Sequence, residues 1–185
     1  LNSNLYLEKK IKVCEIKKNI GYGHGIMTGV KIATGECIGW CHADLQTEPM
    51  DVYEAYFKNS DKLKNQKFIV KGLRKNRNIL DSIFTFGMSV FETILLQKPM
   101  WDINAQPTIF HKSFFQLWEN PPTDFSIDLY AYFMAKKSNL VIKRFPVEFS
   151  KRLHGQSNWN VSLMGKYKFI KRTLTYSFML KRKLG

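Results

Sequence analysis

The sequence predicts an α/β domain, in which strands alternate with helices along the chain. Short apolar runs of strand length are separated by longer segments whose apolar residues recur at helical spacing. The chain has 185 residues, of which 44% are hydrophobic and 14% aromatic, and this is enough for one substantial core. We find no internal repeat, low-complexity segment or linker, so one domain is the simplest organisation.

The first predicted elements lie before residue 35. Residues 11–16 alternate apolar and polar side chains, which predicts a strand. Residues 19–25 contain three glycines and are expected to form a loop, because glycine tolerates unusual backbone angles. Residues 26–33 carry apolar side chains at helical spacing, and Gly35 is a suitable residue to end that helix.

The middle of the chain continues the alternation. Residues 37–41 form a short apolar run, which fits a buried strand. Residues 49–57 begin with proline and predict a helix, because proline suits the first helical turn. Residues 68–70 predict another strand, and residues 80–96 predict a long apolar helical segment that ends before a proline.

The last elements follow a polar loop at residues 101–107. Residues 108–111 predict a short strand. Residues 124–137 predict a helix with an acidic beginning and a basic end, as the helix dipole favours. Residues 140–147 predict a strand near a sheet edge, because Pro146 cannot donate a ladder hydrogen bond.

The formal net charge of +14 indicates a partner that carries phosphate groups. No acidic residue follows Glu148, so the positive charge is concentrated in the tail. We expect residues 161–185 to form a basic amphipathic helix after a domain of residues 1–160. Such a helix fits an anionic membrane surface, RNA, or plain packing on the domain with solvated lysines.

Three cysteines, Cys14, Cys37 and Cys41, show neither the pattern of a disulfide scaffold nor a second ligand pair for zinc. They are expected to be reduced and buried. No secretory signal and no run of 18 apolar residues is visible. These features favour a cytoplasmic protein, with the inner face of the membrane as a second possibility.

The segment His42-Ala43-Asp44-Leu45-Gln46 follows the predicted strand at residues 37–41. Ligands of open α/β sheets gather at the carboxyl ends of strands. Because side chains of an extended chain alternate, His42, Asp44 and Gln46 would point the same way. Together they would hold Mn²⁺ or Mg²⁺, with diphosphate oxygens as the remaining ligands. The alternative is an ordinary polar junction between a strand and a loop.

Three further segments carry groups that suit phosphate. Gly23 lies in a glycine cluster before a helix, although a plain tight turn is the better explanation of this cluster from the residues alone. Arg74 follows a predicted strand and would reach a phosphate, or it is simply solvated. The loop from Arg152 to Ser157 combines a cation, a glycine and a hydroxyl, so it would close over a diphosphate or form a basic surface loop.

Asp124 and Asp128 are four residues apart and are expected to share one face of the helix at residues 124–137. Either would serve as a general base, and Asp128 is the better candidate. The alternative is that both only interact favourably with the helix dipole.

Taken in order, these segments resemble the family 2 glycosyltransferases, and most of all their polyprenyl-phosphate branch, which is similar to dolichol-phosphate mannose synthase. The resemblance runs from about residue 19 to residue 160. It rests on NIGYGHG at residues 19–25, HADLQTEP at residues 42–49, VKGLR at residues 70–74, D-x-N-A-Q-P at residues 102–107, and P-V-E-F followed by Arg152, Gly155 and Ser157.

The resemblance implies a GT-A fold, a Rossmann-like mixed sheet flanked by helices. It implies transfer of a sugar from a nucleoside diphosphate sugar to a lipid phosphate or to a glycan such as a cell-envelope polysaccharide, with inversion and with Mn²⁺ or Mg²⁺. In this family, Asp44 would bind the metal and Gln46 would be a further ligand. Asp128 lies near the position of a catalytic acid or base.

The remaining positions follow from the same resemblance. Gly23, Arg74, Arg152 and Ser157 would lie on the donor side, and Asp102 and Gln106 on the acceptor side.

Two departures from the family pattern matter. His42 replaces the first aspartate of the metal motif, which favours a non-catalytic relative that binds sugar nucleotides or lipids as the second hypothesis. The family's opening βαβ unit, which holds the nucleotide base, has no counterpart, so the residues are expected to start one such unit into the domain. A nucleic-acid-binding protein is the third and weakest hypothesis, because only the net charge supports it.

Overall fold

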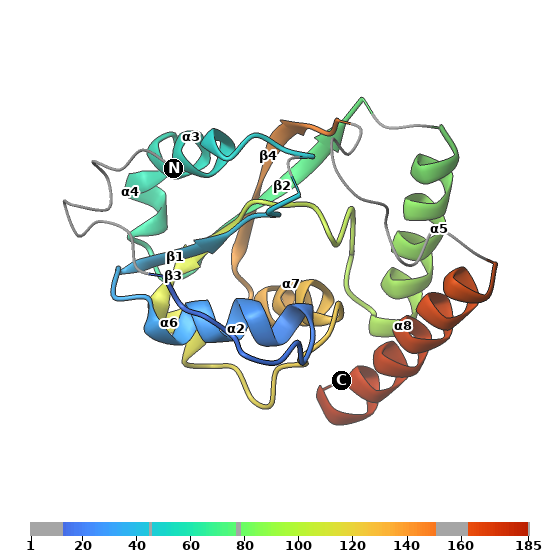
Figure 1. Cartoon of the computed structure of the whole chain (residues 1–185). Coiled ribbons are helices and arrows are strands. Elements are labelled where there is room, and N and C mark those ends of the chain that lie inside the picture. Colours follow the sequence, from blue (N-terminus) through green and yellow to red (C-terminus); the bar gives the residue numbers. More distant parts are fainter. Residues whose placement is uncertain (1–12, 45, 77–78, 151–162, 185) are drawn as a thin grey trace.

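The computed structural model describes residues 13–44, 46–76, 79–150 and 163–184 (Figure 1). The elements in chain order are α2 (Tyr22–Ile32), β1 (Cys37–Trp40), α3 (Met50–Phe57), α4 (Ser60–Leu63), β2 (Phe68–Lys75), α5 (Ile79–Leu96), β3 (Thr108–His111), α6 (Lys112–Phe115), α7 (Ile127–Lys137), β4 (Val141–Glu148) and α8 (Leu163–Leu184).

A mixed sheet lies at the centre, with the strand order β1-β3-β2-β4. β3 runs antiparallel to both β1 and β2, whereas β2 and β4 are parallel. α3 and α4 cover one face, and α2, α6 and α7 cover the other (Figure 1). The predicted α/β class, a mixed sheet flanked by helices, is confirmed.

The two faces of β2 explain why the sheet is covered on both sides. Ile69 packs into the cluster that holds the buried residues of α2 and α7. Its neighbours Phe68 and Val70 pack into a second cluster with Ala55 and Leu63 from α3 and α4. Successive side chains of a strand point to opposite faces, so an apolar run in β2 requires helices on both.

Several predicted elements agree closely with the structure. β3 has the predicted bounds, and α3 and α5 begin within one residue of the prediction. β2, predicted at residues 68–70, extends to Lys75 because β4 pairs with it in parallel as far as the pair Lys75 and Glu148.

The predicted strand at residues 11–16 is wrong over residues 13–16, which are not in a strand. Val13 is 69% exposed, and Ile16 is exposed as well. An alternating pattern produces a strand only where a neighbouring strand supplies backbone partners and a layer covers the apolar side chains.

The glycine cluster is the start of a helix rather than a separate loop. α2 begins at Tyr22, after Gly21 with φ 144°. A Cβ on Gly23 would lie 2.5 Å from the carbonyl oxygen of Pro122, and the amide of His24 donates to the carbonyl of Thr123 at 2.9 Å. The glycines therefore let the start of α2 approach the segment before α7.

α7 begins at Ile127, so the expected shared helix face of Asp124 and Asp128 is wrong. Asp124 lies in the preceding turn, where its Oδ1 accepts from the amide of Ser126 at 2.9 Å. Such a local bond offers the backbone an alternative to the helix. Asp124 also pairs with Arg172 of α8 at 3.4 Å.

α5 and α8 pack against each other beside the sheet layers (Figure 1). Phe91 and Phe178 meet edge to face, and Leu180 is buried. Ser177 and Glu92 form a buried hydrogen bond of 2.5 Å. In the described part of the chain, no helix combines the length and the apolar character that crossing a membrane requires.

Glu92 predicts a pH-dependent stability. Burial raises the pKa of its carboxyl from 4.5 to about 7, although the hydrogen bond with Ser177 opposes this. The stability given by the neutral carboxyl is complete below pH 4.5 and is lost as the pH rises to about 7. The unfolding free energy of wild type should therefore fall by about 3 kcal/mol across this range. That of Glu92→Gln should not show this fall, because an amide does not ionise.

Urea unfolding at about pH 4.5 and about pH 8 measures this difference. Glu54→Gln, on the exposed surface of α3, is the control and should follow wild type. Parallel pH profiles for wild type and Glu92→Gln would contradict the prediction.

Candidate active site

The predicted metal ligands lie in the loop after β1, where Asp44 and Gln46 are in contact. Asp44 Oδ1 accepts from the amide of Gln46 at 3.2 Å. The side-chain amide of Gln46 donates to the carbonyl of Ser150 at 3.3 Å, and the Gln46 carbonyl accepts from the Ser150 amide at 2.9 Å. The ring of His42 stacks on Tyr22, with the centroids 6.2 Å apart. The end of β4 and the start of α2 therefore hold this loop.

Among the residues that the structure describes, no three His, Cys, Asp or Glu side chains are grouped for a metal ion. Mg²⁺ in phosphate-binding sites commonly uses one or two carboxylates and takes its other ligands from substrate phosphates and water. Asp44 at the end of β1 fits that kind of site. A closed protein cage, in contrast, does not fit the described residues.

Asp128, in the first turn of α7, lies under this loop and is 1% exposed. Its Oδ2 accepts from the hydroxyl of Tyr22 at 3.2 Å and from the amide of Gln106 at 3.3 Å. Its Oδ1 accepts from the indole of Trp40 at 3.4 Å. Both carboxylate oxygens of Asp128, the predicted base, therefore already accept hydrogen bonds from buried protein groups.

Lys71 supplies the cation for this carboxylate. Its Nζ lies 3.7 Å from Asp128 Oδ1 and donates to the carbonyl of Ala105 and the hydroxyl of Thr108 at 2.9 and 3.1 Å. Burial lowers the pKa of Lys71 to about 8, while the charge of Asp128 opposes the shift. A pKa of about 8 leaves Lys71 charged at neutral pH, so opposite charges lie side by side in the core.

Tyr22 connects this buried group with the loop after β1. Its hydroxyl donates to Asp128 and accepts from Gln106. Its ring stacks on His42 and, at 4.7 Å, on Phe125. Burial and the nearby Asp128 raise the pKa of the Tyr22 hydroxyl far above its ordinary range, so it remains a donor.

A second buried carboxylate, Asp102, holds two arginines. The Asp102 carboxylate accepts from the backbone amide of Arg74 at 2.9 Å and from Nε of the Arg74 side chain at 2.8 Å. Nη2 of Arg74 donates to the same carboxylate. Nη2 of Arg144 donates to the Asp102 carbonyl at 3.3 Å. Burial alone would raise the pKa of Asp102, but the charge and hydrogen bonds of Arg74 hold it below its usual value.

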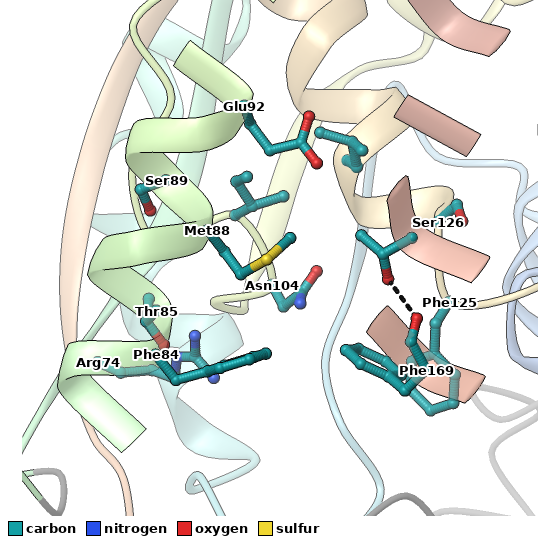
Figure 2. Close-up of a pocket in the computed structure, with 13 residues that line it drawn as sticks. Arg74, Phe84, Thr85, Met88, Ser89, Glu92, Asn104, Phe125, Ser126 and Phe169 are labelled. Carbon is teal, nitrogen blue, oxygen red and sulfur yellow. Dashed lines mark hydrogen bonds between the residues drawn. The ribbon is translucent and has the colours of Figure 1, made fainter. Parts of the chain in front are cut away.

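These contacts place the other predicted site residues. Arg74, with an 11% exposed side chain, is paired with Asp102 and still lines a pocket between α5, α7 and α8 (Figure 2). Gln106 is buried on Tyr22, and Gly23 is buried against the segment before α7. Arg152 and Ser157 lie outside the described residues.

Sequence reasoning missed Tyr22, Trp40, Lys71 and Glu92. Lysine within the apolar run of β2 and glutamate within the apolar α5 were available signals, because charged residues are rarely buried without a partner. The sequence around Tyr22 and Trp40 carries no comparable signal, since an aromatic residue in a helix or an apolar strand is usually part of the core.

The Asp102 pair predicts a large loss of stability on Asp102→Asn. Removing one charge of a buried pair leaves its partner uncompensated and costs about 3–5 kcal/mol. Asp61→Asn is the control, because it breaks the exposed pair with Lys64 and should cost at most about 1 kcal/mol. Urea unfolding measures both, and equal losses would exclude a structural role for the Asp102 pair.

Comparison with known proteins gives a family match for part of the chain and a similar fold. The model of the glycosyl transferase family 2 matches residues 3–65, about a third of the chain, including the loop of Asp44. No curated protein matches the sequence.

A solved structure with a similar fold is glucosyl-3-phosphoglycerate synthase from Mycobacterium tuberculosis, in complex with phosphoglyceric acid. The TM-score is 0.57 at 9% sequence identity, over 91% of this chain and 57% of that one. The chain therefore spans little more than half the length of that protein. The fold is GT-A-like. The family match over residues 3–65 of the chain supports a glycosyltransferase of family 2.

Proposed function

We propose that the protein is an inverting, metal-assisted hexosyltransferase of the polyprenyl-phosphate branch. It would move a sugar from a nucleoside diphosphate sugar to a lipid phosphate. The observation that carries the proposal is the loop of Asp44, which lies at the carboxyl end of β1 within the segment matched by the family model. Ligands of α/β sheets bind at such ends.

On the donor side, Asp44 would hold Mn²⁺ or Mg²⁺, and the donor's diphosphate would supply further oxygen ligands. When bound, the ion would neutralise the charge of the departing diphosphate. Arg152 and Ser157 would contact the donor phosphates. Arg74 has its charge oriented by Asp102, so a phosphate would meet a guanidinium that is already ordered.

On the acceptor side, the burial of Asp128 favours a phosphate over a hydroxyl. A hydroxyl acceptor needs a base within hydrogen-bond reach, and Asp128 is occupied by Tyr22, Trp40 and Gln106. A phosphate, whose second pKa is about 6, is already anionic at neutral pH and needs no base. The similar synthase was solved with phosphoglyceric acid, which is also an anion.

Asp44→Ala tests the donor site. Loss of the proposed ligand should weaken Mn²⁺-dependent binding of nucleoside diphosphate sugars by about tenfold or more, since even indirect changes at metal sites cost that much. Calorimetric titration of GDP- and UDP-sugars with and without Mn²⁺ measures it. Asp61→Ala, an exposed carboxylate, serves as the control. Unchanged binding by Asp44→Ala would reject the proposed metal site.

A second candidate is a non-catalytic relative that binds sugar nucleotides. His42 favours it, because an imidazole stacked on Tyr22 stands where the family has a carboxylate. Metal-dependent release of the sugar from its nucleotide, lost in Asp44→Ala, would exclude this candidate.

We also propose that the pair α5 and α8 rests on an anionic membrane surface. α5 exposes an apolar stripe at helical spacing, formed by Ile79, Ile83, Phe86, Val90 and Ile94. α8, which packs against α5, exposes basic residues including Lys168, Lys171, Lys181, Arg182 and Lys183. An apolar face next to a basic one is typical of helices that lie in the membrane interface.

Phe86→Asp tests this surface. A charge in the stripe should weaken sedimentation with vesicles that contain phosphatidylserine, because the apolar face contributes to interfacial binding. Phe57→Asp is the matched control, since Phe57 is an exposed phenylalanine on α3, which lies away from α5 and α8 (Figure 1). Equal sedimentation of both variants and wild type would refute the proposed surface.

A further inference from the structure

The pocket between α5, the start of α7 and α8 has mainly apolar walls (Figure 2). Phe84 and Met88 line it from α5, Leu129 from α7 and Phe169 from α8. Figure 2 shows the side chains of Phe84, Met88 and Phe169 directed into the space between the helices. Such walls favour an apolar ligand, because water inside gains few hydrogen bonds from them.

One polar side chain in the pocket has an unused acceptor. Glu92 is completely buried, and its Oε2 has no hydrogen-bond partner among the described residues. Figure 2 shows its carboxyl extending from α5 into the pocket. A buried acceptor without a donor costs about 1–3 kcal/mol, so a ligand that supplies a donor would bind more tightly.

The two contacts of the Ser177 hydroxyl favour a protonated Glu92. The Ser177 hydroxyl has one proton and lies 2.9 Å from the carbonyl of Thr173 and 2.5 Å from Glu92 Oε1. If it donates to Thr173, the second contact needs a proton from Glu92. A protonated Glu92 satisfies both contacts, and its remaining oxygen, Oε2, is then a neutral acceptor. The raised pKa of this carboxyl agrees with that assignment.

We propose that this pocket binds an apolar molecule that carries a hydroxyl group, with the hydroxyl donating to Oε2 of Glu92. The pocket shares Arg74 with the proposed donor side, but the inference rests on Glu92 and the apolar walls and not on the proposed transfer reaction. A neutral acceptor favours a neutral donor. A carboxylate or a ketone brings only acceptors to Oε2, and an apolar molecule without polar groups leaves it unsatisfied.

Calorimetric titration with octanol, octanoate and a methyl ketone of the same chain length tests the proposal. The three probes share their apolar chain and differ in the group offered to Glu92. Octanol should bind about tenfold more tightly than the ketone and octanoate, which is the effect of one well-placed hydrogen bond.

Two variants assign the preference to Glu92. Glu92→Leu removes the acceptor, so octanol and the ketone should then bind equally. Glu92→Gln keeps an amide oxygen and should retain the preference for octanol, provided that circular dichroism shows a native fold. Glu92→Met also removes the acceptor and serves as the second variant if Leu does not fold.

Three outcomes would overturn the proposal. Equal binding of octanol and the ketone to wild type would show that no donor is recognised. Binding of none of the probes would show that the pocket is filled by protein or water. An unchanged preference in Glu92→Leu would place the hydroxyl elsewhere.

Discussion

The ion pair between Lys71 and Asp128 in the core is the interaction on which the other parts of the site depend. A buried carboxylate is tolerated only when cations and donors surround it. Here the partners come from α2, β1, β2 and the segment before β3, through Tyr22, Trp40, Lys71 and Gln106. Because each partner belongs to a different segment, satisfying one carboxylate fixes four segments relative to α7. The loop of Asp44 follows Trp40 directly, so this network also sets where that loop begins.

Asp102 fixes the neighbouring part of the sheet by the same principle. It binds Arg74 from β2 and Arg144 from β4, two strands that are paired in parallel. Lys71, Arg74 and Arg144 are therefore held in or near the interior by two carboxylates. Part of the net charge of +14 thus serves the architecture, and only the remainder, much of it on α8, is available to external phosphate groups or lipid.

The sequence predicted those parts of the fold that follow from local patterns. β3 and α5 were found from apolar runs and helical spacing, because sheet and helix partners cover these segments. The same pattern failed at residues 13–16, where no such cover exists among the described residues. The position of Asp44 followed from its place after β1. The contact of Tyr22 with Asp128 joins residues 106 apart, and no local pattern predicts a pairing at that distance.

The two buried acids, Asp128 and Glu92, meet the same constraint in opposite ways. Asp128 lies where a sheet, a helix and a loop converge, and side chains from several segments supply a cation and donors. Glu92 projects from α5 toward α8, where helical backbones already use their own amides and the hydroxyl of Ser177 supplies its hydrogen bond. This difference in available donors explains why Asp128 is paired with Lys71, whereas burial raises the pKa of Glu92 to about 7. A charged acid with every oxygen occupied orients its neighbours, whereas a neutral acid with one free oxygen facing a pocket is suited to recognising a ligand.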